Sequence, residues 1–144
     1  LDYETLDLIA DSYIPILALL ALTSLARTAI MSRCRLLGIH MAILLFGLLL
    51  AYGLMFVDIH LRLWPMLGLD YSTHTAVALV MVIFLIIAVK KYSSIWIASL
   101  GGYILLMLYQ GYHSIADMIS TAFIVGALFL PAVFLFCKKH RSNR

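Results

Sequence analysis

The sequence has few charged residues. Asp, Glu, Lys and Arg make up only 12% of its 144 residues, whereas soluble domains carry about 25%. Apolar residues make up 65% of the chain, well above the roughly 45–50% of soluble domains. This composition excludes a water-soluble globule and a disordered chain, and the length allows one domain, residues 1–144. We therefore predict an integral membrane protein.

Other absences exclude further classes of protein. The net charge is only +3 and the basic residues lie in short clusters rather than in a stripe, so we expect no nucleic-acid partner. Internal repeats are absent, which argues against a transporter that works by alternating access. Neither His-x-x-x-His nor His-Glu-x-x-His occurs, so the common helical zinc motifs are missing.

Long apolar runs are what the chain does have. A membrane-spanning helix needs about 20 mostly apolar residues, and five such stretches can be recognised. They cover about residues 11–26, 36–57, 73–89, 93–109 and 116–137. A closed β-barrel would need alternating apolar and polar residues, but several of these runs are apolar on every face. The sequence predicts an all-α, polytopic bundle of about five transmembrane helices.

Charges of opposite sign are sorted between the two ends of this predicted bundle. Nine of the ten basic residues follow the first, third or fifth helix: Arg27, Arg33, Arg35, Lys90, Lys91, Lys138, Lys139, Arg141 and Arg144. The seven acidic residues fall at the other end: Asp2, Glu4, Asp7, Asp11, Asp58, Asp70 and Asp117. Because an excess of Lys and Arg marks the cytoplasmic side, we expect the N-terminus outside and the C-terminus in the cytoplasm.

Two segments on the outer side collect the residues that could do chemistry. Ionisable groups near membrane depth are costly and usually mark function, and here they fall in residues 58–74 and 112–117. His113 and Asp117 are four residues apart, a spacing that on a helix puts both on one face. A carboxylate bound to one imidazole nitrogen leaves the other nitrogen basic. His113 could then attack a substrate while His74 donates a proton to the leaving group.

At these residues the chain resembles the type 2 phosphatidic acid phosphatase superfamily of membrane lipid phosphatases and phosphotransferases. That family's second motif is Pro-Ser-Gly-His-Thr, and Tyr71-Ser72-Thr73-His74-Thr75 opens a helix in the same way. Its third motif ends His-x-x-x-Asp and also leads into a helix, as His113–Asp117 does. The resemblance covers about residues 58–130, roughly half of the chain.

The resemblance implies a role for each matching residue. His113 would be the nucleophile that forms a phosphohistidine, Asp117 would orient it, and His74 would protonate the leaving oxygen. It implies no metal and no other cofactor. The partner would be a membrane lipid in the bilayer, and self-association into a homo-oligomer is left open. Residues expected to contact the substrate are Ser72, Arg62, Tyr71 and Tyr112.

The chain departs from the family pattern in its basic residues. The first motif, Lys-x6-Arg-Pro, is echoed only by residues 62–65, with Met55 in the place of the lysine, and residues 106–107 replace the Ser-Arg of the third motif. One arginine neutralises a phosphomonoester dianion poorly, because transition-state charge needs aimed cations or donors. A phosphodiester carries a single charge. Asp70-Tyr71 and Gly111-Tyr112-His113 are similar to stretches of the sphingomyelin-synthase branch, whose members move head groups between lipids.

We therefore expect a membrane lipid phosphatase or phosphotransferase that acts on a phosphorylated lipid or phospholipid head group through a phosphohistidine. Its site would face the periplasm from a bacterial inner membrane, or the lumen of an endomembrane. Two alternatives stay open. One is a catalytically inactive membrane component that packs on a partner. The other is a metal-dependent membrane hydrolase, with ligands drawn from His60, His74, His113, Asp117 and Asp58.

Overall fold

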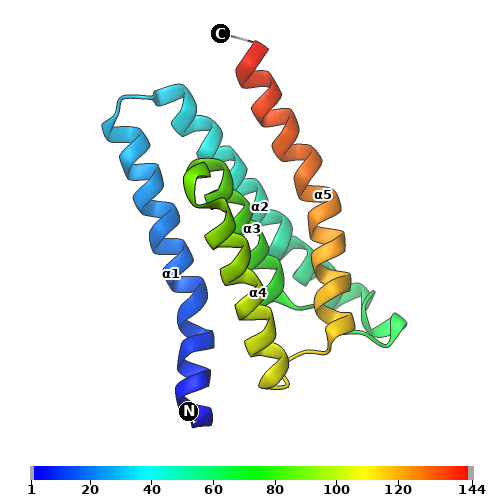
Figure 1. The fold of residues 1–144 in the computed structure, drawn as a ribbon. Coiled ribbons are helices and arrows are strands. Elements are labelled where there is room, and N and C mark those ends of the chain that lie inside the picture. Colours follow the sequence, from blue (N-terminus) through cyan, green and yellow to red (C-terminus); the bar gives the residue numbers. More distant parts are fainter. Residues whose placement is uncertain (1, 143–144) are drawn as a thin grey trace.

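The structure, a computed structural model, describes residues 2–142, with side chains as far as Lys138. These residues form five α-helices and two short 3-10 helices, and no strand occurs among them (Figure 1). The helices are α1 (Tyr3–Ile30), α2 (Cys34–Leu61), α3 (Thr73–Ala88), α4 (Ser93–Tyr109) and α5 (Ile115–Ser142), with η1 (Pro65–Leu67) before α3 and η2 (Lys90–Tyr92) before α4. The all-α prediction is confirmed.

Successive helices run in opposite directions along the bundle, so the two chain ends lie at opposite ends of the molecule (Figure 1). The turn between α1 and α2 lies at the same end as the C-terminus, and so does η2. We call this the basic end, because Arg27, Arg33, Arg35, Lys90, Lys91 and Lys138 lie there. The loop that holds η1 and the turn between α4 and α5 lie at the opposite end. We call that the acidic end, because Asp2, Glu4, Asp7, Asp11, Asp58, Asp70 and Asp117 lie on that half of the bundle.

Helix α3 forms the centre of the bundle. It packs against α1, α2, α4 and α5, and the side chains of Ala76, Val80 and Phe84 are fully buried. A helix that is apolar on every face is a buried helix, and here protein rather than lipid covers most of that surface. His74 is the only exposed residue of α3. The uniform apolarity of this run therefore reflects its burial among four other helices.

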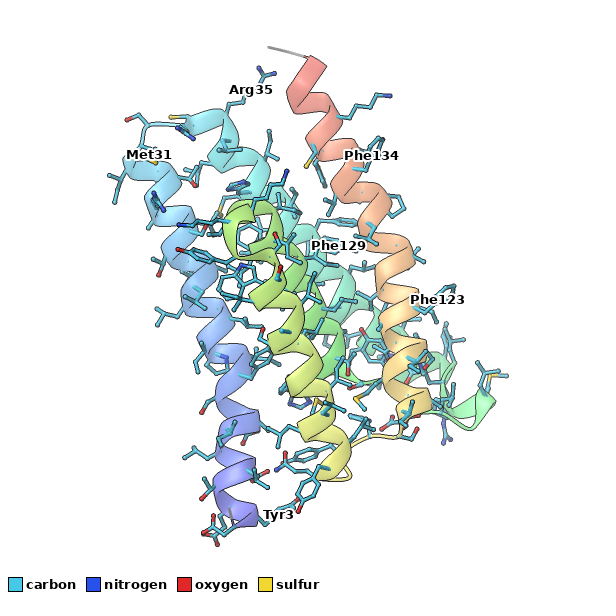
Figure 2. The ribbon with its side chains drawn as sticks, in the orientation of Figure 1. Tyr3, Met31, Arg35, Phe123, Phe129 and Phe134 are labelled. Atoms are coloured by element: carbon cyan, nitrogen blue, oxygen red, sulfur yellow. The ribbon has the colours of Figure 1, made fainter. Side chains whose placement is uncertain are left out.

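Four helical segments are long and apolar enough to cross a membrane, which is consistent with an integral membrane protein. These segments are Tyr3–Ile30, Cys34–Leu61, Lys90–Tyr109 and Ile115–Lys138. Five spans were expected. Helix α3 has only 16 residues, about 24 Å at 1.5 Å per residue, which is short of a hydrocarbon core about 30 Å thick. The outer helices carry exposed apolar side chains such as Leu19, Leu49 and Phe123, and Phe123 projects away from α5 in Figure 2.

The first helix begins at Tyr3 rather than near residue 11 as expected. Asp2 caps it, since its carboxylate accepts a hydrogen bond from the Thr5 backbone N–H at 3.1 Å and from the Thr5 hydroxyl. Acidic residues in the first turn suit the positive end of a helix dipole. The hydrophobicity pattern placed the start of the helix at the start of the apolar run. The acidic segment that precedes this run is helical as well.

Helix α2 approaches α3 and α5 most closely at Gly47. A Cβ atom at this position would lie 2.9 Å from the Phe129 ring and would overlap Val80 Cγ1. Both neighbours are fully buried, so neither can swing away into open space. Glycine is therefore required by the close approach of the helices rather than by the backbone angles.

Gly47→Ala is expected to lower the free energy of unfolding by about 1–3 kcal/mol, because overpacking forces buried neighbours to shift. The matched control is Gly53→Ala in the same helix, where nothing lies within 4 Å of the added Cβ. Alanine favours a helix over glycine by about 1 kcal/mol, so the control should be neutral or slightly stabilised. Denaturant unfolding in detergent, followed by tryptophan fluorescence, measures both. Equal unfolding midpoints for Gly47→Ala and the wild type would contradict the close approach.

Candidate functional site

Asp117 joins the two chemistry-bearing segments at the acidic end. Its carboxylate is buried. One oxygen, Oδ1, accepts the backbone N–H of Asp70 at 2.8 Å. The other, Oδ2, accepts the backbone N–H of Ser114 at 2.8 Å and the Ser114 hydroxyl at 2.7 Å. The Ser114 hydroxyl in turn accepts the Asp117 N–H at 3.2 Å. Asp117 therefore fixes both the start of α5, as one half of a capping box, and the loop that leads into α3.

The carboxylate beside the His113 ring is that of Asp70. His113 Nδ1 lies 3.6 Å from Asp70 Oδ2, with the two side chains 14% and 71% exposed. Helix α5 begins only at Ile115, so the expected stacking of His113 and Asp117 on one helical face is wrong. No hydrogen bond or ion pair between the Asp117 carboxylate and the imidazole is present among the described contacts. The hydrogen-bonding capacity of Asp117 goes to the loop and the cap instead.

Ser72 and Tyr71 were expected to contact the substrate, and both are buried. The Ser72 hydroxyl caps α3: it accepts the Thr75 N–H at 3.3 Å and lies 2.9 Å from the Thr75 hydroxyl. The Ser72 backbone N–H donates to the Thr121 hydroxyl at 3.1 Å. With its side chain 0% exposed, Ser72 does not face a substrate in this structure. It ties the first turn of α3 to α5.

The Tyr71 side chain holds the same loop against α2. Its hydroxyl donates to the Ala51 carbonyl at 2.8 Å, and its ring packs edge-on against Trp64 with centroids 4.8 Å apart. Burial, with a smaller contribution from the Asp58 carboxylate, raises the pKa of the Tyr71 phenol. The phenol therefore stays protonated and keeps its donor. Tyr71 is an anchor of the loop here rather than a contact for the substrate.

The sequence analysis missed a further anchor of this loop. The buried Asp58 carboxylate accepts the Trp64 backbone N–H at 2.8 Å, and the Trp64 indole N–H donates to the Ser120 hydroxyl at 3.0 Å. These contacts join the end of α2, the η1 loop and α5. An aspartate at the end of a predicted helix was the only signal, and it does not reveal a partner six residues away.

His74, Arg62 and Tyr112 are the exposed members of the expected site. His74 and Tyr112 line one small cavity of about 40 Å³ together with Asp11 and three apolar residues. Ligand pockets are typically about 300–1,000 Å³, so a lipid head group would need side chains here to move. His113 is not among the residues that line this cavity. Arg62 ends α2 in the left-handed conformation, with φ of 53°.

Tyr112 connects this cavity to the first helix. Its hydroxyl donates a hydrogen bond to the Asp7 carboxylate. This bond, more than any other cause, raises the pKa of Tyr112 to about 12. The phenol is therefore a proton donor at neutral pH and not a base. The contact brings α1, which the sequence analysis had not included in the site, next to the third motif.

The residues suggested as metal ligands are not gathered together. No group of three or more His, Cys, Asp or Glu residues in the described part of the chain is placed to hold a metal ion. His60 Nδ1 instead lies 2.8 Å from the Phe56 carbonyl, on an exposed part of α2. The Asp58 carboxylate accepts the backbone N–H of Trp64. The geometry therefore gives the metal-dependent hydrolase no support.

The acidic end thus combines a largely buried histidine facing a carboxylate, a second histidine exposed on the first turn of α3, and an exposed arginine. Buried hydrogen bonds hold the η1 loop that carries Asp70 and lies between Arg62 and the start of α3. Comparisons of the chain with protein-family models, with curated proteins and with solved structures found no match.

Proposed function

We propose that the chain is a membrane-embedded lipid phosphatase or phosphotransferase in which His113 carries the phosphoryl group. The observation that supports this most is the placement of the Asp70 carboxylate 3.6 Å from His113 Nδ1. A carboxylate on that side favours the tautomer with its proton on Nδ1, so Nε2 keeps its lone pair and can act as a nucleophile. The resemblance of residues 71–75 and 113–117 to motifs of the type 2 phosphatidic acid phosphatase superfamily adds independent support.

The reaction would proceed in two displacements. Nε2 of His113 attacks the lipid phosphorus, and the bond from phosphorus to the leaving lipid oxygen breaks. That oxygen takes a proton from the protonated His74 imidazole. Water or an acceptor alcohol then attacks the phosphohistidine, gives its proton to His74, and restores the His113 ring. His113 lies in the turn before α5 and His74 in the first turn of α3, at the same end of the bundle.

The scarcity of positive charge at the acidic end disfavours a substrate with two negative charges on phosphorus. Arg62 is the only one of the ten basic residues outside the basic clusters, and it is exposed at this end. Helices α3 and α5 both begin here, so the positive ends of two helix dipoles add weak further stabilisation. This is enough for a phosphodiester or a zwitterionic head group but little for a dianion. We therefore favour transfer or hydrolysis of a phospholipid head group.

The excess of Lys and Arg at the opposite end supports a cytoplasmic location for that end. The proposed site then faces the periplasm or an organelle lumen and takes its lipid from the outer or lumenal leaflet. The four helical segments that are long and apolar enough to cross a membrane would hold it at the membrane surface. Localisation of a tag on the C-terminus would test this orientation directly.

The function is tested with purified protein in liposomes that contain EDTA. The substrates are phosphatidic acid, phosphatidylglycerol and phosphatidylcholine labelled with ³²P. We expect turnover of a phosphodiester lipid that resists the chelator, with label trapped on the protein as an acid-labile, alkali-stable phosphohistidine. Adding an acceptor alcohol, such as diacylglycerol or ceramide, distinguishes transfer from hydrolysis. Turnover abolished by EDTA would overturn the mechanism, and no turnover of any lipid would favour a non-catalytic component.

A further inference from the structure

A second cavity lies at the basic end, far from the candidate site. Its volume is about 600 Å³, within the range of about 300–1,000 Å³ usual for ligand pockets. It is bounded by the last turns of α1, the first turns of α2, the end of α3, and η2 with the start of α4. Met31, which is labelled in Figure 2, is one of the residues that line it. None of the roles considered so far uses this cavity.

The cavity is lined by positive charge without a matching negative one. Arg27 and Arg33 line it, and none of its lining residues is Asp or Glu. All seven acidic residues of the sequence belong to the other half of the bundle. No ion pair joins either arginine to a carboxylate among the described residues. A guanidinium keeps its charge at every physiological pH, so no carboxylate of the described residues balances this exposed pair, and an anionic ligand could do so.

One residue of the wall carries a hydrogen-bond donor without a partner. Trp96 lines the cavity, and its indole Nε1, which is shielded from solvent, has no hydrogen-bond partner among the described residues. Buried polar groups are nearly always paired, because an unpaired donor keeps the full cost of its desolvation. The remaining wall is largely apolar, with Leu20, Leu36 and Leu85. A cationic rim, an inner N–H donor and an apolar wall together suit an anion that also carries an apolar part.

We propose that this cavity binds the head group of an anionic phospholipid from the leaflet at the basic end. Its phosphate would lie against Arg27 and Arg33, and a head-group or ester oxygen would accept the Trp96 N–H. Arg27 stands in the last turn of α1, which brings it close to the head-group level of a membrane that α1 spans. Leu20, Met31 and Tyr92 line the cavity and are exposed on the bundle surface, so acyl chains can leave toward the bilayer. Arginine is well suited to bidentate contacts with phosphate.

Native mass spectrometry of the detergent-solubilised full chain tests this site. Dioctanoyl phosphatidylglycerol is the probe, with dioctanoyl phosphatidylcholine and inorganic phosphate as comparisons. We expect saturable binding of the phosphatidylglycerol and at least about tenfold weaker binding in the double variant Arg27→Gln, Arg33→Gln. The matched control, Lys91→Gln with Lys138→Gln, removes two charges from exposed positions at the same end that do not line the cavity. It should bind as the wild type does.

Three results would overturn the proposal. Equal weakening in the control would mean that only the overall surface charge attracts the lipid. If phosphatidylcholine bound as tightly as phosphatidylglycerol, the net negative charge of the lipid would not contribute to binding. If inorganic phosphate bound as tightly, the cavity would be an ion site rather than a lipid site. If the arginine variant does not fold, Trp96→Phe removes the indole donor alone, and it should weaken binding several-fold. Binding should persist in His113→Ala, so this test and that of the proposed function can fail separately.

Discussion

Replacing His113 with alanine is expected to lower lipid turnover by a factor of at least about 10³, because the reaction loses its nucleophile. Stability should change far less than turnover. The His113 side chain is largely buried, but its only described ion-pair partner is the exposed Asp70 carboxylate. Initial rates in liposomes measure the first effect, and thermal unfolding in detergent measures the second. A variant that stays folded, with an unfolding temperature lowered by a few degrees at most, but does not turn over lipid is the result we expect.

His60→Ala is the matched control for this experiment. His60 also lies at the acidic end, but it is exposed on α2 and its described hydrogen bond is to the Phe56 carbonyl of its own helix. Its loss should leave turnover unchanged. Asp70→Asn should reduce turnover by about tenfold or more and alter its pH profile, because a neutral amide no longer favours a proton on Nδ1. Full turnover by His113→Ala would exclude the phosphohistidine.

Asp117→Ala is expected to cost about 3–5 kcal/mol of folding free energy. The substitution removes the acceptor for two backbone N–H groups, those of Asp70 and Ser114, and for the Ser114 hydroxyl. Each bond to a charged acceptor contributes roughly 1.5–3 kcal/mol, and a buried donor left unpaired adds its own desolvation cost. Denaturant unfolding in detergent measures the loss. Limited proteolysis should show earlier cleavage in the loop at residues 62–72.

The companion variants separate the three bonds of Asp117. Asp117→Asn keeps one acceptor oxygen and should lose about half as much as alanine. Ser114→Ala removes one side-chain partner from the cap of α5, and should cost about 1 kcal/mol. If Asp117→Ala unfolds at the wild-type midpoint, the carboxylate does not hold the loop and the helix together, and the orienting role expected from the sequence becomes the better explanation.

The presence of the five helices and the side of the bundle on which each connection lies could be predicted, because they depend on local patterns. Uninterrupted apolar runs mark the helices, and the sorting of charge between alternate connections predicts which turns lie together. The central position of α3 could not be predicted in this way. An apolar run of 16 residues looks the same whether lipid or other helices cover it, and only the packing against four neighbours distinguishes the two.

The candidate site was predicted less well because its contacts are of long range. The four-residue spacing of His113 and Asp117 assumed that the helix had already begun. Ser114 and Asp117 form a capping-box pattern, which was a local signal that it had not. The partner that His113 does face, Asp70, is more than forty residues away in the sequence. No spacing rule reaches across such a distance.

A local sequence signal also explains why Ser72 is buried. A serine three residues ahead of Thr75 is a sequence signal for a helix cap, and the structure shows that cap. Because the surrounding residues resemble a catalytic motif, we expected the Ser72 hydroxyl to contact the substrate phosphate rather than to cap the helix. In this structure the hydroxyl is fully buried and engaged with Thr75. His74, two residues later, keeps its side chain exposed.

Because protein rather than lipid surrounds α3, bilayer thickness acts on the four outer helices and not directly on the helix that carries His74. Hydrophobic mismatch is normally relieved by tilting the helices that face the acyl chains. Here such tilting would take place around a central helix that has almost no lipid contact of its own. The depth of His74 is then set by its packing within the bundle. Activity should therefore change little between bilayers of different acyl length, even where the outer helices change their tilt.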